Sequence, residues 1–496
     1  MPQKYSTGHD HISSRVVKHA IEYLADILAE LINCWMQNGV VPNELKIAKV
    51  VPIYKTGDTN IFSNYRPISV LPFFSKLFEK AIANRITEYM DKYNVINNCQ
   101  FGFRKQRSTD MAVIEMIEKI TQALDSNSYA VGIFLDLSKA FDTVNHTILL
   151  SKLEHYGIRG IALKWFKNYL SDRYQYVSIE NLDSRKQKIT CGVPQGSILG
   201  PILFLLYIND IINSSSILHF ILFADDTNLF YCNKSMEELN RILNDELQSV
   251  VSWINANKLT LNIDKTNFIV FKSINKSNPT ISVEINGNII NRVHNTKFLG
   301  VYVDENLAWN AHVSNISKKV SKNIGILYKL RYKLPTAVLL TLYNSLLLPY
   351  FSYCNIVWAC CYHSRLASLI VLQKRAVRIV SNISGRAHTS PLFRNNNILK
   401  ITDINNMQVA LFMFKYYNSL LPPLFDSFFA LNVDVHSYFT RSSQMFHIPS
   451  IRTNMRKHSI VFVGPRLWNH INPCICNSQS VNSFKFQYKK FLLSQY

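Results

Sequence analysis

Three aspartates follow predicted strands at positions where their carboxylates could act together. Residues 131–135 are an apolar run, typical of a strand buried on both faces, and the run ends in Asp136. A second apolar strand, residues 217–223, ends in a turn with Asp225 and Asp226, and another strand follows at once. Taken singly, each site is better explained by an Asp that marks a turn. If the strands are neighbours, however, the three carboxylates meet and require cations.

Hard oxygen ligands of this kind suit Mg²⁺, which keeps open positions for water and substrate phosphates. Two such ions can activate a 3′-hydroxyl and stabilise a leaving pyrophosphate during nucleotidyl transfer. The sequence contains none of the motifs G-x-x-x-x-G-K-[ST], G-x-G-x-x-G, H-E-x-x-H or G-x-S-x-G. His470, Cys474 and Cys476 lack a fourth ligand and the usual spacing of a zinc site. Nucleotidyl transfer is therefore the chemistry that the residues favour.

Periodicity indicates which elements position these residues. Helical patterns occur at residues 17–35, about 74–91, 109–125, 146–155 and 160–171. Strand patterns occur at 46–54, 129–137, 174–180, 186–191, 217–223, 228–232, 268–272, 281–285 and 297–303. Pro52 predicts that the first of these strands lies at a sheet edge. From residue 310 to about 380 the pattern is helical only, so a mixed α/β region precedes a helical one, with the boundary near Asp304.

The positive charge of the chain is concentrated in its second part. The whole chain has 54 Lys and Arg against 33 Asp and Glu, but residues 306–496 have 22 against three. Residues 306–402 contain no carboxylate and 13 Lys and Arg, among them Lys318, Lys319, Lys322, Lys374, Arg375 and Arg378. This predicts a surface that binds nucleic-acid phosphates, the alternative being a solvated basic face.

The chain shows no features of a secreted or membrane protein. Its nine cysteines form an odd set without a C-x-x-C pair, which favours reduced thiols inside a cell. Residues 334–364 carry no full charge, yet a polar residue falls on most turns, which favours buried helices over a membrane span. We therefore expect an intracellular protein of the nucleus, the cytoplasm or both, with no membrane partner.

The segments that contain the three aspartates, and several others, resemble motifs of a known family. Residues 134–142 (FLDLSKAFD), 192–201 (GVPQGSILGP) and 223–226 (FADD) resemble the successive polymerase motifs of reverse transcriptases. In detail they are similar to those of non-LTR (LINE-type) retrotransposons of the jockey-like group. Further blocks with this similarity are NYRPIS at 64–69, QFGFR at 100–104, LNIDKT at 261–266, FLGV at 298–301 and GPRLWN at 464–469. The ordered set covers nearly the whole chain.

The resemblance implies an α+β, right-hand polymerase fold, with fingers and an antiparallel palm sheet followed by a mainly helical thumb and C-terminal region. Residues 1–35 are expected to form an N-terminal helix, 36–304 the reverse transcriptase domain, and 305–400 a basic thumb-like region. For residues 401–496, also basic, the sequence predicts no particular fold.

The resemblance also implies roles for individual residues. Asp136, Asp225 and Asp226, with the carbonyl of Leu137, would hold two Mg²⁺ ions, for which Mn²⁺ can substitute. Residues implied to bind the nucleotide are Arg66 at the triphosphate, Phe141 under the sugar, and Gln195 and Gly196 in the pocket wall. Lys265 would protonate the leaving pyrophosphate. Without the resemblance, the alternatives are a core aromatic for Phe141 and solvated surface cations for Arg66 and Lys265.

The expected function is that of an RNA-directed DNA polymerase, which adds dNTPs to the 3′-hydroxyl of a DNA or RNA primer on an RNA template. The alternative is an inactive relic that only binds nucleic acid. Elements of this family carry an endonuclease before the polymerase, whereas residues 1–4 with Gly8 and Asp10 resemble the end of the connecting linker. We therefore expect a chain that is truncated at its N-terminus. The intact aspartates favour the active polymerase.

Overall fold

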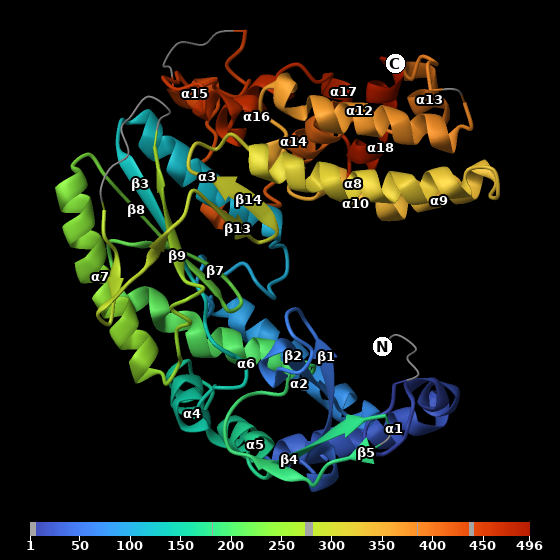
Figure 1. Ribbon diagram of the computed structural model, residues 1–496. Coiled ribbons are helices and arrows are strands. Elements are labelled where there is room, and N and C mark those ends of the chain that lie inside the picture. The colour runs from blue at the N-terminus through green and yellow to red at the C-terminus, as the bar shows by residue number, and fades with distance from the viewer. Residues whose placement is uncertain (1–5, 181, 273–280, 384, 436–440) are drawn as a thin grey trace.

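The central sheet has five strands in the order β12-β9-β3-β8-β7 (Figure 1). The computed structural model describes residues 6–180, 182–272, 281–383, 385–435 and 441–496; residues 1–4, with their resemblance to a linker, lie outside this range. β3 lies in the middle and pairs antiparallel with β8 and β9, so the strand that precedes Asp136 is the neighbour of the strand that begins at Asp226. The strands are β3 (Tyr129–Leu135), β7 (His219–Phe223), β8 (Asp226–Asn233), β9 (Asn267–Phe271) and β12 (Asn291–Arg292).

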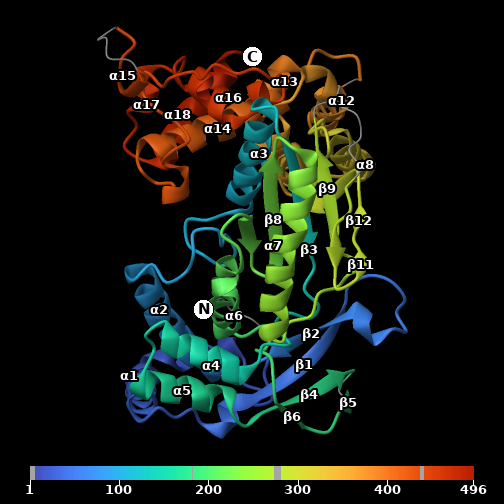
Figure 2. The same cartoon turned by 90° about the vertical axis from the view of Figure 1, so that its left-hand side faces the viewer.

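Helices cover both faces of this sheet, which explains why β3 is apolar throughout (Figure 2). Side chains alternate along the strand: Ala130 and Phe134 belong to the core that contains α3. Val131, Ile133 and Leu135 belong to the core on the opposite face, with α6 and α7. These helices are α3 (Thr109–Asp125), α6 (Leu199–Ile208) and α7 (Met236–Ala256), and η3 (Asn209–Ser214) follows α6. The end of β3 that leads to Asp136 is therefore held from two sides.

A second sheet contains β2, β1, β4 and β5 in that order, with β6 also paired to β4. The prediction of an edge position for the first strand is wrong, because β1 lies between β2 and β4. The pairing of β1 with β4 ends at Val50, however, so Pro52 is paired only with β2. Its partner there is Pro67, and because neither proline has an N–H group, no hydrogen bond between the strands is lost at this pair. The strands are β1 (Ile47–Tyr54), β2 (Tyr65–Val70), β4 (Arg173–Ile179), β5 (Leu182–Asp183) and β6 (Gln187–Ile189).

Helices surround the second sheet where the sequence predicts them. The first helix ends at Gly39, which adopts the left-handed conformation (φ 65°) that glycine tolerates. It begins at residue 14, so only part of the expected 1–35 segment is helical. The elements are α1 (Ser14–Asn38), η1 (Asn43–Lys46), η2 (Phe62–Asn64), α2 (Phe73–Lys92), α4 (His146–His155) and α5 (Gly160–Leu170).

Two predicted strands differ from the structure. The segment 297–303 is not one strand but two, β13 (Asn295–Phe298) and β14 (Val301–Asp304), which pair antiparallel. Leu299 (φ 43°) and Gly300 (φ 88°) form the two-residue turn between them, and glycine supplies the positive φ that such a turn needs. Of the segment 281–285, only β10 (Glu284–Ile285) is a strand, paired with β11 (Asn288–Ile289).

Residues 306–496, called the helical half below, share one hydrophobic core with α3. In its described residues, the predicted helices over 310–380 are confirmed, and no helix is both long and apolar enough to cross a membrane. α14 contacts α10, α11 and α12 as well as α16 and α18, so residues 305–400 and 401–496 pack together. The elements are α8 (Asn310–Leu330), α9 (Thr336–Leu346), α10 (Leu348–Ser352), α11 (Asn355–Trp358), α12 (His363–Val380), α13 (Ser390–Asn395), α14 (Ile401–Tyr417), η4 (Pro423–Phe425), α15 (Asn432–Val435), η5 (Arg456–His458), α16 (Ile460–Trp468), α17 (Pro473–Cys476) and α18 (Val481–Ser494).

Carboxylates on α3 connect the sheet to the helical half. Asp110 accepts a hydrogen bond from the backbone N–H of Cys354 at 3.2 Å. Glu118 is buried against the start of α16, where the backbone N–H groups of Ile460 and Val461 face its carboxyl group. Burial raises the pKa of Glu118 to about 7, and these donors and Arg456 oppose that shift. α3 therefore anchors the helical half at several points along its length.

The last residue of α3 makes the most extensive of these contacts. Asp125 Oδ1 accepts hydrogen bonds from Arg452 N (3.0 Å), Thr453 N (2.7 Å) and Thr453 Oγ1 (2.9 Å). The Arg452 guanidinium donates to the carbonyls of Asp125 and Leu124. We expect Asp125→Ala to lower the free energy of unfolding by about 2 kcal/mol, because hydrogen bonds to a charged group are lost together. Urea denaturation measures this, with exposed Glu22→Ala on α1 as control; equal effects of the two changes would contradict it.

Candidate active site

The structure confirms that Asp225 and Asp226 lie at the tip of the β7–β8 hairpin. Phe223 pairs with Asp226, and Ala224 adopts a positive φ (57°) in the turn. The buried side chain of Gln100 holds this turn, since its Oε1 accepts hydrogen bonds from Ala224 N (3.0 Å) and Gly102 N (2.8 Å). The turn is therefore shaped by its backbone contacts and leaves both carboxylates for other contacts.

The QFGFR block thus has a role that the sequence alone did not assign. A Cβ atom on Gly102 would lie 2.4 Å from Ala224 N, so only glycine allows this approach. Residues 99–101 also run beside β7, with hydrogen bonds from Leu222 N to Cys99 O and from Phe101 N to Leu222 O. The block acts as a support for the aspartate turn.

Asp136 follows β3 and is level with Asp226, because Leu135 pairs with Thr227. Its backbone carbonyl accepts a hydrogen bond from Asn262 N (2.8 Å), and Ser138 N donates to Thr260 O (2.8 Å). Leu137 and Leu261 form the non-hydrogen-bonded pair between these two bonds. The carbonyl of Leu137 therefore points away from residues 260–262 and is not used by this bridge.

The electrostatics of the three aspartates reflect their mutual proximity. Removal from water is the largest cause that raises the pKa values of Asp225 and Asp226, and the negative charge of Asp136 contributes to both shifts. The charge of Asp225 also contributes to the shift of Asp226, whose pKa is raised to about 6. Among the described residues, no group of three His, Cys, Asp or Glu side chains lies close enough together to hold a metal ion. The carboxylates share one end of the sheet without forming a closed cluster.

Basic residues approach these carboxylates from two sides. Lys265 Nζ lies 3.9 Å from Asp136 Oδ2, and both side chains are substantially exposed, so this ion pair is weak. The positive charges of Arg66 on β2 and Lys55 after β1 oppose the rise in the pKa of Asp225. Sequence analysis missed Lys55, whose only signal was its position in the turn that precedes the Arg66 block. The β1–β2 ribbon thus presents cations to the aspartate turn.

Gln195 and Gly196 lie beside β2, whereas Phe141 lies beside α6 and accepts a hydrogen bond at its carbonyl from Val193 N (2.8 Å). The Phe141 ring stacks on Phe204 of α6, with centroids 4.6 Å apart and planes at 27°. Gln195 O accepts a hydrogen bond from Ser69 N on β2 (2.7 Å). Gly196 has φ 116°, and a Cβ atom there would lie 2.5 Å from Ser69 O, so another residue would push the strand away.

Asp142 is a further residue of this group that sequence analysis did not single out. Gln195 Nε2 donates to both carboxylate oxygens of Asp142, each at 3.0 Å. Burial raises the pKa of Asp142, and the hydrogen bond from Gln195 opposes the shift. This contact orients the Gln195 amide. The only signal for it was that Asp142 closes the FLDLSKAFD motif.

The predicted basic surface lies on two helices that pack against each other, α8 and α12. Lys318, Lys319 and Lys322 are exposed on α8, and Lys374 and Arg375 are exposed on α12. Arg378 is half-buried, and its Nε donates to the carbonyl of Ala387 at 2.9 Å, so this cation also has a structural contact.

The aromatic residues near this surface fall into two classes. Tyr328 and Tyr332 are exposed at the end of α8, where the Arg331 guanidinium lies over both rings. Trp358 is fully buried, and its Nε1 donates to the carbonyl of Tyr353. Trp358 is therefore a core residue, and the two tyrosines are the aromatic residues available to a bound molecule.

Comparisons with known proteins identify the family to which the chain is similar. Residues 53–303 match the family described as "Reverse transcriptase (RNA-dependent DNA polymerase)". The chain is 29% identical over 415 residues to the "RNA-directed DNA polymerase from mobile element jockey" of Drosophila melanogaster, covering 81% of this chain and 45% of that protein. It is 29% identical to the "Probable RNA-directed DNA polymerase from transposon BS" of the same species, over 80% and 45% of the two chains. The chain spans less than half the length of these relatives.

Among solved structures, the chain is similar to a telomerase from Candida tropicalis in complex with a fragment of telomeric RNA. The TM-score is 0.40 and the sequence identity 12%, and the alignment covers 77% of this chain and 65% of the telomerase.

Proposed function

The chain belongs to the reverse transcriptase family, and from this premise we propose that it is the RNA-directed DNA polymerase of a non-LTR retrotransposon. Its mixed sheets and helices have the α+β architecture of a right-hand polymerase. The observation that carries the proposal is the position of Asp136 beside the Asp225–Asp226 turn, on adjacent strands and opposite the cations of the β1–β2 ribbon. Its substrates are dNTPs, an RNA template and a DNA or RNA primer, in the nucleus, the cytoplasm or both.

The polymerase regions follow from this assignment. We assign the palm to the central sheet with α3, α6 and α7, and the fingers to the second sheet and its helices, all within residues 36–304. The thumb is assigned to residues 305–400. Figure 1 shows α8 and α9 on the side of the helical half that faces β1 and β2, which supports this assignment.

The aspartates fit a divalent metal ion by their chemistry. Carboxylate oxygens are the ligands that Mg²⁺ prefers, and burial together with the negative charges of Asp225 and Asp136 raises the pKa of Asp226, a repulsion that a bound divalent cation would relieve. Asp136, Asp225 and Asp226, with the unused carbonyl of Leu137, would hold two Mg²⁺ or Mn²⁺ ions. When bound, such ions activate the primer 3′-hydroxyl and neutralise the leaving pyrophosphate.

The other residues of the site bind and orient the incoming nucleotide. Arg66, with Lys55, faces the aspartates and is placed to bind the triphosphate. Gln195 and Gly196 form the wall of the nucleotide pocket, with the Gln195 amide fixed by Asp142. Lys265, beside Asp136, is the proposed proton donor to pyrophosphate.

Primer extension on an RNA template tests this function. The full chain, a labelled DNA primer, dNTPs and Mg²⁺ should yield extended primer, and EDTA should abolish the reaction. A folded protein that binds the template–primer but never extends it would instead support the alternative, a relic that only binds nucleic acid.

Phe141 should control the choice of sugar. Its ring is fixed by Phe204, so it can exclude a ribose 2′-hydroxyl by contact alone. We expect Phe141→Ala to raise the ratio of ribonucleotide to deoxyribonucleotide incorporation by about tenfold, which corresponds to about 1.4 kcal/mol of discrimination. Single-nucleotide kcat/KM values measure this ratio. Phe141→Tyr keeps the ring and serves as the control; an unchanged ratio in the Ala variant would make Phe141 a packing residue.

A further inference from the structure

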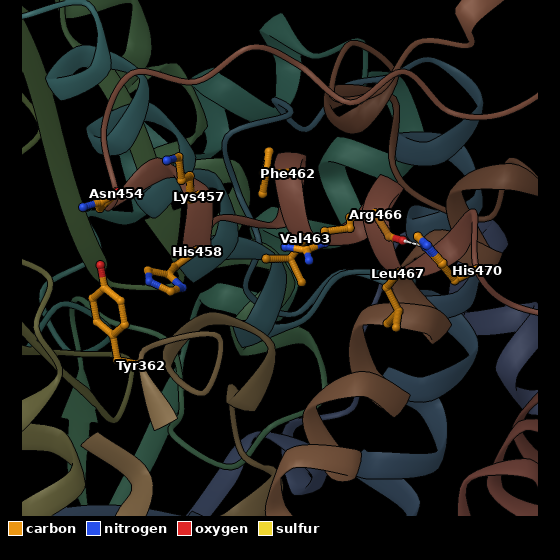
Figure 3. A pocket seen from close by; sticks show the side chains of 9 residues that line it. All are labelled: Tyr362, Asn454, Lys457, His458, Phe462, Val463, Arg466, Leu467 and His470. Atoms are coloured by element: carbon orange, nitrogen blue, oxygen red, sulfur yellow. Dashed lines mark hydrogen bonds between the residues drawn. The ribbon is translucent and has the colours of Figure 1, made fainter. Parts of the chain in front are cut away.

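A cleft of about 780 Å³ opens in the helical half, between the start of α12, η5 and α16 (Figure 3). None of its lining residues lies within residues 53–303, which match the polymerase family. Its charged and ring-bearing lining residues are Tyr362, Lys457, His458, Phe462, Arg466 and His470. The cleft is therefore a feature separate from the aspartate site.

The charge of this cleft is entirely positive. No Asp or Glu lines it. Neither Lys457 nor Arg466 has an ion pair with any residue that the structure describes, and both side chains are exposed. His470 Nδ1 lies 2.7 Å from the carbonyl of Arg466 and must donate to it, so Nε2 faces away from that bond. Two exposed cations without an ion pair among the described residues suit a ligand that carries phosphates.

Aromatic rings form the other part of the cleft. The Tyr362 ring is 54% exposed and stands edge-on to His458, with centroids 4.6 Å apart and planes at 74°. His458 is fixed in turn by a hydrogen bond to the backbone of Cys360. Phe462, on the first turn of α16, is half-buried in the same cleft (Figure 3). Exposed, immobilised rings are the platforms on which nucleobases stack.

We propose that this cleft binds a single-stranded polynucleotide, with phosphates at Lys457 and Arg466 and a base against Tyr362. An open cleft with exposed cations suits a chain that passes through it, whereas a free nucleotide is usually enclosed. The inference goes beyond the polymerase function and does not depend on it. It gives the protein a second contact with nucleic acid, outside the template–primer site.

The contribution of Lys457 and Arg466 to binding is tested on the full chain. Fluorescence anisotropy measures the affinity for a labelled 12-nucleotide uridine RNA and for its DNA counterpart. Excess unlabelled template–primer duplex occupies the polymerase site. The double variant Lys457→Glu/Arg466→Glu should bind at least tenfold more weakly, and the slope of log K against log salt should fall by about 1.4, since each single-strand phosphate contributes about 0.7. The control, Lys485→Glu/Lys490→Glu on α18, makes the same charge change at exposed lysines outside the cleft.

Equal losses in the two double variants would overturn the proposal, because they would indicate general attraction to a basic protein. Displacement of the RNA by poly-glutamate at equal charge concentration would also overturn it, in favour of an acidic protein partner. Cleft-dependent binding of either oligonucleotide supports it, and the ratio of the two affinities identifies RNA or DNA as the occupant. None of these measurements requires polymerase activity, so failure of the proposed function leaves the test intact.

Stacking is tested separately from charge. Tyr362→Ala should weaken binding by about tenfold without changing the salt slope, and Tyr362→Phe should bind like the wild type. Photo-crosslinking of a 4-thiouridine RNA to the unmutated chain, read by mass spectrometry, should label peptides that contain Tyr362 or Phe462. Crosslinks confined to residues outside the cleft would contradict the site even if a variant failed to fold.

Discussion

Asp225→Asn should reduce primer extension by a factor on the order of a thousand or more, because metal ions supply several kcal/mol of transition-state stabilisation and an amide cannot replace the carboxylate charge. Asp136→Asn and Asp226→Asn should have the same effect. The fold should not suffer, since the turn is held by the hydrogen bonds of Gln100 and not by the carboxylates.

Stability should in fact change in the opposite direction to activity. The pKa values of Asp225 and Asp226 are raised by lost hydration and like charge, so near neutral pH their ionised forms oppose folding. We therefore expect Asp225→Asn and Asp226→Asn to have a Tm equal to or above that of the wild type in EDTA. The measurement pairs extension rates with thermal unfolding of the same samples.

The matched control is Asp245→Asn on α7, an exposed aspartate whose surface pair with Arg241 at 3.5 Å contributes little. It should keep full activity. Full activity in any of the three site variants would refute the assignment of that aspartate. A loss of activity accompanied by a fall in Tm would mean that the carboxylate supports the fold, contrary to the role given to Gln100.

Reversing three lysines of α8, Lys318, Lys319 and Lys322, to Glu should weaken binding of template–primer and make it less dependent on salt. If about six cations of the thumb contact phosphate, the slope of log K against log salt is about −5 on duplex and about −4 on single strands. The triple change should flatten the duplex slope by up to about three units, because each lost phosphate contact releases about 0.9 fewer counterions. Titration at several salt concentrations measures this slope.

Charge reversal is preferable here to deletion of residues 306–496. The helical half shares its core with α3, so deletion would expose apolar residues of the palm as well as remove charge. The control reverses three exposed lysines at the other end of the chain, Lys18 on α1 with Lys164 and Lys167 on α5. An unchanged slope in the α8 variant, or an equal change in the control, would show that residues 1–305 hold the nucleic acid.

The local elements were largely predictable from the sequence. Side-chain periodicity depends on neighbours a few residues apart, so α3 was predicted to the residue and the β7–β8 hairpin was recognised from its Asp-Asp turn. The ordered motifs indicated the aspartates and the family for the same reason, since each motif is contiguous. The hairpin at Leu299 and Gly300 was missed because a short apolar run reads equally as one strand or two.

The order of the strands was decided only by tertiary structure. That β3 lies next to β8, and β1 between β2 and β4, depends on contacts between residues far apart in sequence, which periodicity does not encode. The support of the aspartate turn by Gln100 spans 124 positions, and that of residues 452 and 453 by Asp125 more than 320.

Sequence by itself determined which residues carry charge and the approximate positions of most helices, because those properties are local. It located the positive charge in residues 306–496 but gave no sign that these residues would share a core with α3, or that Lys55 would face Asp225. Only the folded chain decides which charges meet, since burial and distance, and not residue type, set the strength of an electrostatic interaction.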